Sequence, residues 1–72
     1  MKKIKKIKIR VNGKVKSISY NCSLSNLVKN LKIPMKKVAI ELNQEIIDKK
    51  IISKINLKKN DQIEIVHFIG GG

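Results

Sequence analysis

Cysteine, proline, arginine and aromatic residues are all scarce in this chain of 72 residues. Cys22 is the only cysteine, so no disulfide can form within the chain. Cys22 and the single histidine, His67, are too few for a structural zinc site, which normally takes four ligands, and we expect no metal. No apolar run is long enough for a transmembrane helix, and no secretory signal is recognisable. These absences favour a cytoplasmic location without membrane contact.

Positive charge is abundant. The chain has 17 lysines and arginines against 5 acidic residues, a net charge of +12. Such a balance raises nucleic acid or an anionic membrane as possible partners. However, the lysines are spread over the whole chain, Arg10 is the only arginine, and only Tyr20 and Phe68 could stack on bases. We therefore expect a solvated lysine surface, with nucleic acid an unfavoured partner.

The first twenty residues predict a β-hairpin. Ile7, Ile9 and Val11 alternate with basic residues, which is the period of a strand with one buried face. Asn12-Gly13 follows, the strongest short hairpin signal because both residues tolerate positive φ. Residues 15–20 are the expected returning strand.

A short amphipathic helix is predicted next. Ser23 is placed to act as its N-cap, with the hydroxyl accepting from a free backbone N–H of the first turn. Four apolar residues then fall on one helical face: Leu24, Leu27, Val28 and Leu31. We expect Pro34 to end the helix, because the residue before a proline disfavours helical geometry.

The second half is predicted to return to strands. Residues 38–42 alternate as a half-buried strand, Asn43-Gln44 turns the chain, and 45–47 can form a short partner strand. One or two helical turns are expected within residues 49–57, before a polar turn at 59–61.

The final strand is expected at 63–69 and is apolar on both faces, except at Glu64 and His67. Such a strand is usually central in its sheet, either covered on both sides or used at an interface. The order of elements predicts an α+β fold of the β-grasp (ubiquitin-like) type, with a mixed sheet of four to five strands packed on one main helix. Residues 1–69 would form this domain and residues 70–72 a flexible tail.

Three glycines, Gly70, Gly71 and Gly72, follow the final strand. Glycine has no Cβ, so a glycine arm can enter a narrow channel on another protein and leaves its acyl carbon unhindered. A frayed end is the alternative. Directly after an apolar strand, we favour a functional tail that threads into a partner's active site.

The segment 63–72, IEIVHFIGGG, resembles the C-terminal signature of the ThiS family of sulfur carriers in thiamine biosynthesis. Residues 38–47 resemble that family's middle strand and turn, and the opening strand with Asn12-Gly13 also fits. The resemblance therefore covers essentially the whole chain, although its most specific part is the last ten residues.

This resemblance implies a chemistry centred on Gly72. An E1-like adenylating enzyme of the ThiF type would use ATP to convert the Gly72 carboxylate into an acyl-adenylate. A persulfide sulfur donor would then give a thiocarboxylate, which carries sulfur to a ThiG-like thiazole synthase. The chain would be a substrate and carrier, not an enzyme, with no permanently bound cofactor. We expect the free chain to be a monomer.

Other residues near the tail have two interpretations each. Val66, Phe68 and Ile69 are either a partner-docking patch or members of the core. His67 is expected to be a surface or hydrogen-bonding residue rather than a catalytic one. Cys22 has no basic neighbour in the sequence, and we expect a buried, unreactive thiol.

Three alternatives stay open. The small subunit of molybdopterin synthase is a related carrier that also ends in Gly-Gly, and a protein-conjugating modifier would use the same activated glycine. A β-grasp RNA-binding module is a different class, supported by the charge of +12 but leaving the glycines unexplained. The marked basicity is the one feature that departs from the family pattern.

Overall fold

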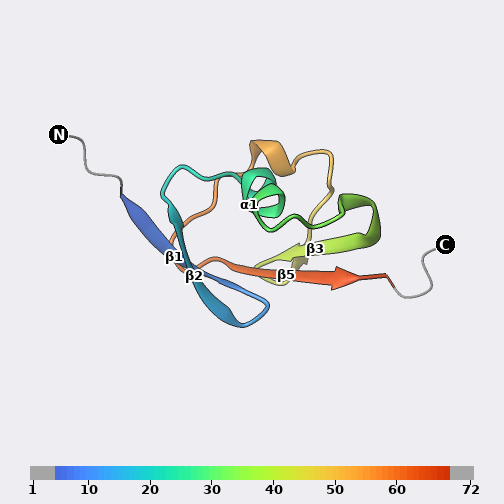
Figure 1. The fold of residues 1–72 in the computed structure, drawn as a ribbon, viewed down its shortest axis with the longest axis horizontal. Helices are drawn as coiled ribbons and strands as arrows, with labels where there is room; N and C mark the ends of the chain where they lie inside the picture. The colour runs from blue at the N-terminus through green and yellow to red at the C-terminus, as the bar shows by residue number, and fades with distance from the viewer. Residues whose placement is uncertain (1–4, 69–72) are drawn as a thin grey trace.

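The computed structural model describes residues 5–68, which form a five-stranded mixed sheet with helix α1 (Leu24–Asn30) packed across one face (Figure 1). The strands are β1 (Lys6–Val11), β2 (Lys14–Ser19), β3 (Val38–Leu42), β4 (Glu45–Ile46) and β5 (Gln62–His67). Two short 3-10 helices, η1 (Met35–Lys37) and η2 (Ile52–Lys54), lie in the connections. This is the predicted α+β arrangement, with η1 an element that the sequence pattern had not indicated.

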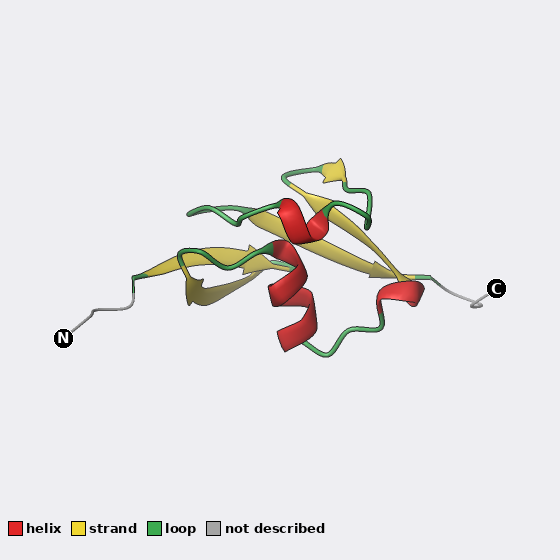
Figure 2. Ribbon diagram, turned by 90° about the horizontal axis from the view of Figure 1, so that it is seen from above, coloured by secondary structure: helices red, strands yellow, loops and turns green. Residues whose placement is uncertain are grey.

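The sheet order is β2-β1-β5-β3-β4, so the final strand is central as predicted. β5 is parallel to β1 and antiparallel to β3. Figure 1 shows α1 and η2 on one side of the sheet, and Figure 2, which looks down from that side, shows α1 crossing in front of the strands, so within residues 5–68 no helix covers the other face. The boundary predicted between a domain at 1–69 and a tail at 70–72 lies outside the described residues.

Both predicted hairpin turns place two successive residues at positive φ, a conformation that Gly and Asn adopt readily and Gln does not. Asn12 and Gly13 have φ of 50° and 83°, and Asn43 and Gln44 have φ of 51° and 72°. Two successive residues with positive φ make the turn type whose twist matches a right-handed β-hairpin. The turns therefore fix the registers of β1 with β2 and of β3 with β4.

Helix α1 begins as predicted but ends for a different reason. The Ser23 Oγ accepts a hydrogen bond from the Asn26 N–H at 3.1 Å. At the other end Lys32 adopts a φ of 56°, and the N–H of Ile33 bonds back to the Val28 carbonyl. This reversal completes the helix before the chain reaches Pro34, so the prediction that the proline ends it is wrong.

The core lies between α1 and the covered face of the sheet. Leu24 and Leu27 of α1 are at most 1% exposed, as are Ile9, Ile40 and Ile63 of the three inner strands. Burying these side chains supplies most of the favourable free energy in so small a domain, because apolar area removed from water is the main driving force.

Candidate functional site

The predicted tail begins where the central strand β5 ends. Phe68 follows the last residue of that strand, and its backbone N–H donates to the Lys37 carbonyl at 2.9 Å. This hydrogen bond extends the pairing of β5 with the β3 side of the sheet by one residue. The predicted site residues Ile69, Gly70, Gly71 and Gly72 lie outside the described residues, so the structure defines the root of the tail, residues 66–68.

β5 buries one face and exposes the other. Ile63 and Ile65 are in the core, whereas Glu64 and Val66 point away from it. Val66 and Phe68 are 51% and 54% exposed. Within residues 5–68 nothing covers this second face, so full burial on both sides, one of the two predicted options, is wrong. Core membership is excluded for Val66 and Phe68, and their role in docking stays a prediction.

The open face of the sheet carries apolar and acidic residues side by side. Val66 lies opposite Ala39, and Glu64 lies opposite Glu41. The register of β4 places Ile46 opposite Glu41, so Ile46 shares this face, and it is 77% exposed. Ile46 was not among the residues predicted for the site, although the pairing of strands across the Asn43-Gln44 turn places it on this face.

Lys49 lies against the root of the tail. Its Nζ donates to the carbonyls of Met35 at 2.7 Å and Val38 at 2.8 Å, and lies 5.6 Å from the centroid of the Phe68 ring. No sequence motif could have indicated this contact, because it depends on where the folded sheet brings Phe68.

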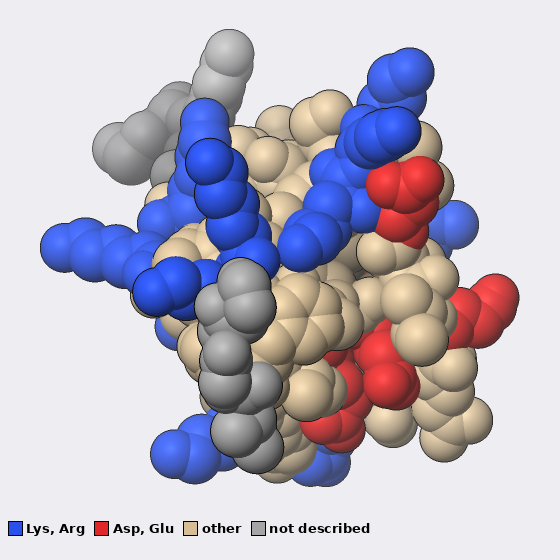
Figure 3. All heavy atoms as spheres, turned by 90° about the vertical axis from the view of Figure 1, so that its right-hand side faces the viewer, with Lys and Arg blue, Asp and Glu red and all other residues tan. Residues whose placement is uncertain are grey.

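Charge is unevenly divided at this end of the molecule. In Figure 3, which faces the end of the molecule at which β5 finishes, Lys and Arg cover much of the left and upper surface, and acidic residues lie toward the right and lower middle, one of them beside basic residues at the upper right. Lys36, Lys37 and Lys49, all exposed, belong to the segments that contact Phe68 and its backbone.

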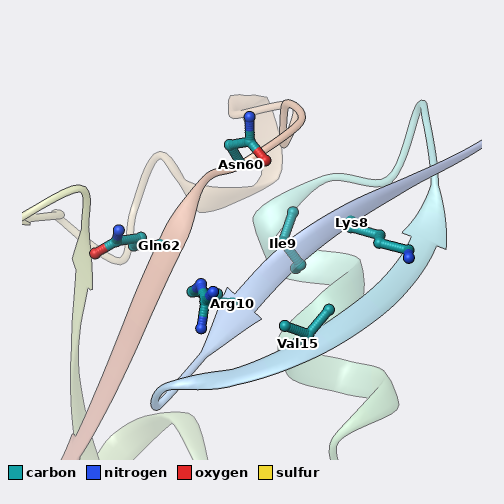
Figure 4. A pocket seen from close by; sticks show the side chains of 6 residues that line it. All are labelled: Lys8, Ile9, Arg10, Val15, Asn60 and Gln62. Carbon is teal, nitrogen blue, oxygen red and sulfur yellow. The ribbon is translucent and has the colours of Figure 1, made fainter.

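A hollow lies on β1 beside the start of β5, away from Phe68 (Figure 4). It measures about 390 Å³ and is lined by Lys8, Ile9, Arg10, Val15, Asn60 and Gln62. Arg10 pairs with Gln62, the first residue of β5, so the hollow and Phe68 are at opposite ends of that strand. Its polar groups are cations and amides, and none is a nucleophile activated by a neighbouring base.

Cys22 and His67 take the places predicted for them. The Cys22 thiol is buried at the junction of β2 and α1 and donates to the Ser23 carbonyl at 3.4 Å. Burial raises the pKa of this thiol, which keeps it protonated and unreactive. His67 is exposed at the end of β5. Among residues 5–68 no three His, Cys, Asp or Glu side chains are grouped to hold a metal ion.

Comparison with known proteins decides the family. The model of the ThiS family matches residues 6–72. The chain is 38% identical over 65 residues to the sulfur carrier protein ThiS of Bacillus subtilis, covering 89% of this chain and 98% of that protein. The chain belongs to the ThiS family.

Two further comparisons agree with this ThiS assignment. The crystal structure of the thiamine biosynthesis protein ThiS from Geobacter metallireducens superposes with a TM-score of 0.79 at 28% identity, covering 92% of this chain and all of that one. A thiazole synthase of Magnetococcus marinus is 36% identical over 66 residues. That match covers 92% of this chain but only 20% of the synthase, so the chain spans about a fifth of the length of such relatives.

ThiS membership confirms the predicted β-grasp fold and the predicted sulfur-carrier family of thiamine biosynthesis. The family match extends through residue 72 and so includes all three glycines. Among the described residues, no helix of this ThiS-family chain is long and apolar enough to span a membrane.

Proposed function

We propose that the chain carries sulfur for thiazole formation as a thiocarboxylate on Gly72. The observation that carries this proposal is the ThiS family match over residues 6–72, which takes in the glycine tail as well as the fold. The exposed root of the tail supports it, because a carrier must present its reactive end to other proteins. Gly70 and Gly71 would supply the narrow arm that reaches a partner's active site.

The chemistry requires activation by another protein. A carboxylate is a poor electrophile until one of its oxygens becomes part of a good leaving group. In the proposed reaction an E1-like, ThiF-type enzyme joins the Gly72 carboxylate to the α-phosphate of ATP and releases pyrophosphate. A persulfide sulfur then attacks the acyl carbon and AMP leaves. Cleavage of the resulting acyl disulfide by a thiol, which is oxidised, releases the thiocarboxylate.

The chain itself is proposed to be a substrate in these steps and not a catalyst. The described residues around Phe68 include Val66, His67, Lys37 and Lys49, and these form no set that could bind ATP or activate a nucleophile. No cofactor is proposed to be bound permanently. A cytoplasmic location and a monomeric free state are part of the same proposal.

Thiazole synthase is the proposed acceptor of the sulfur. The support is that thiazole synthases of Magnetococcus marinus and Paramagnetospirillum magneticum each contain a stretch similar to this chain. When a carrier-like stretch and a synthase occur in one polypeptide, the corresponding separate chains are natural partners. A ThiG-like synthase would therefore receive the tail.

The arrangement of the aromatic residues argues against the RNA-binding alternative. The Tyr20 N–H bonds the Lys5 carbonyl, which places Tyr20 beside the start of β1. Phe68 follows the end of β5, which runs parallel to β1. The two exposed aromatic side chains are therefore at opposite ends of the sheet and cannot form one stacking platform for successive bases.

Intact mass spectrometry tests the proposal. The chain is incubated with ATP, the adenylating enzyme and a persulfide donor, and the expected product has one oxygen of Gly72 replaced by sulfur. A chain lacking Gly71 and Gly72 serves as the matched control and should stay unmodified. An unmodified full-length chain, with the same enzyme shown to activate another ThiS, would overturn the proposal. RNA binding that survives the truncation would support the rival class.

A further inference from the structure

We propose that Lys49 is a positioning residue that sets the direction in which the glycine tail leaves the sheet. This inference rests on the proposed function, because only a carrier needs to deliver its tail to a partner's active site. It concerns the contact between Lys49 and Phe68, at the last point of the chain that the structure describes.

The position of Lys49 follows from the β3–β4 register. β4 pairs Ile46 with Glu41 and Glu45 with Leu42, and the Ile47 N–H then donates to the Ile40 carbonyl. If this register continued for two more residues, Lys49 would lie opposite Val38. If the strand continued, the backbone N–H of residue 49 would be the donor to the Val38 carbonyl.

The strand does not continue, because Asp48 turns the chain. The Asp48 carboxylate accepts from the Lys50 N–H at 2.9 Å, and the Asp48 carbonyl accepts from the Ile51 N–H at 3.0 Å. The Lys49 side chain replaces the missing donor, since its Nζ lies 2.8 Å from the Val38 carbonyl. A second bond, to the Met35 carbonyl at 2.7 Å, ties the same ammonium to η1.

Two carbonyls therefore hold the ammonium beside the aromatic ring. Its Nζ is 5.6 Å from the centroid of Phe68, within the range of a cation–π contact. Fixing a lysine side chain in one conformation costs conformational entropy, so the geometry is maintained by these three interactions acting together.

Phe68 is thereby held at two points. Its backbone N–H bonds the Lys37 carbonyl, and its ring lies against Lys49. A Phe side chain that is 54% exposed would otherwise exchange among rotamers. The residues after Phe68 start from its backbone, so restraining Phe68 also restricts the conformations that a partner must select when it binds the tail. Part of the entropy cost of binding is then removed before the partner arrives.

The test compares Lys49→Met with Lys49→Arg and with Lys50→Met. Methionine keeps an unbranched apolar side chain but removes the ammonium, whereas arginine keeps the charge and a donor. Lys50 is the matched control from the same loop, because its side chain makes no hydrogen bond within residues 5–68. Two quantities are measured: the ring and amide NMR signals of Phe68 in the free chain, and the kinetics of thiocarboxylate formation with the carrier as varied substrate.

For Lys49→Met we expect changed Phe68 ring shifts and faster local motion of the Phe68 amide. We also expect KM to rise about twofold to fivefold with kcat unchanged. The entropy cost of ordering Phe68 would then fall on the binding step, whereas a tail that is already bound reacts as before. Lys49→Arg should keep both the Phe68 signals and the KM close to those of the wild type, and Lys50→Met should change neither. In a Phe68→Leu background, Lys49→Met should have little further effect on KM, because the pair acts as a unit.

Unchanged NMR relaxation of the Phe68 amide in Lys49→Met would overturn the inference. Faster motion of Phe68 with an unchanged KM would also overturn it. A fall in kcat with a lower midpoint of unfolding would show a purely structural role, which also contradicts it. If the wild-type chain accepts no sulfur at all, the proposed function fails. The positioning of Phe68 is then judged on the NMR measurement alone.

Discussion

At the scale of single residues, Asn12 illustrates how a turn residue can hold a distant strand. Its side-chain Oδ1 accepts from the Ile65 N–H at 2.7 Å, and its backbone N–H donates to the Ile63 carbonyl at 2.9 Å. The pairing of β1 with β5 ends at Val11 and Ile63, so the Asn12 amide continues that ladder beyond the end of the strand. One residue thus makes both the hairpin turn and the link to the strand that leads to the tail.

Replacing Asn12 by Ala should destabilise the fold by about 1–3 kcal/mol, because it leaves the part-buried Ile65 N–H without an acceptor and forces Ala into a φ of 50°. Urea unfolding followed by circular dichroism measures the change. Asn12→Asp is the matched control, since it keeps an acceptor and tolerates positive φ, and it should lose clearly less. Equal losses in the two variants would show that the hydrogen bond contributes nothing.

Cys22 gives a prediction about pH. Burial raises the pKa of its thiol above the ordinary value of 9.0, so the folded chain holds the proton more tightly than the unfolded chain. The resulting stabilisation is fully present below pH 9.0 and is lost as the pH rises through the raised pKa.

The difference in unfolding free energy between the wild type and Cys22→Ala should therefore be constant near neutral pH and should shrink above pH 9.0. Urea titrations of both proteins across this pH range measure the difference. The contribution of the lysines to the pH dependence cancels, because both proteins contain the same lysines. A difference that stays constant into the alkaline range would contradict the raised pKa.

At the scale of elements, α1 has only seven residues, so its end contacts matter more than its helix propensity. Ser23→Ala removes the acceptor for the Asn26 N–H and should lower the free energy of unfolding by about 0.5–2 kcal/mol. Ser25→Ala in the same helix is the control and should be close to neutral. Unfolding in urea measures both, and a neutral Ser23→Ala would refute the cap's contribution.

The same helix shows what sequence patterns can and cannot predict about an element. Its beginning follows from Ser23 and the apolar stripe, which are local features. Its end depends on Lys32 adopting a φ of 56°, which is unfavourable for a lysine, between Leu31 and Ile33, which both pack against the core. The proline was a visible stop signal, but the reversal at Lys32 precedes it.

At the scale of the whole molecule, the central place of the final strand could be predicted from its apolar content, whereas the order of the other strands could not. The site was predicted less completely. Val66 and Phe68 were identified by their position beside the glycines, whereas Ile46 and Lys49 join them only through the sheet register. The glycines in the sequence indicate where the proposed chemistry would occur, but the surface around Phe68 is assembled from segments that are distant in sequence.

The net charge of +12 gives the last prediction. Basic residues cover much of the surface at the end of the molecule where β5 finishes (Figure 3), so a partner that presents acidic surface there would be attracted before contact. The association rate with the adenylating enzyme should fall by about tenfold between low and high salt, while the dissociation rate changes little.

Stopped-flow or surface-binding kinetics over a range of salt concentrations measure these rates. Lys36→Gln with Lys37→Gln should slow association at low salt, because both residues belong to η1 beside the backbone of Phe68. Lys14→Gln with Lys16→Gln is the matched control. It removes the same charge from β2, which two strands separate from β3, and should slow association less. Salt-independent association would show that the lysines are only solvated surface. Equal slowing by both pairs would mean that net charge, and not its place beside the tail, governs the encounter.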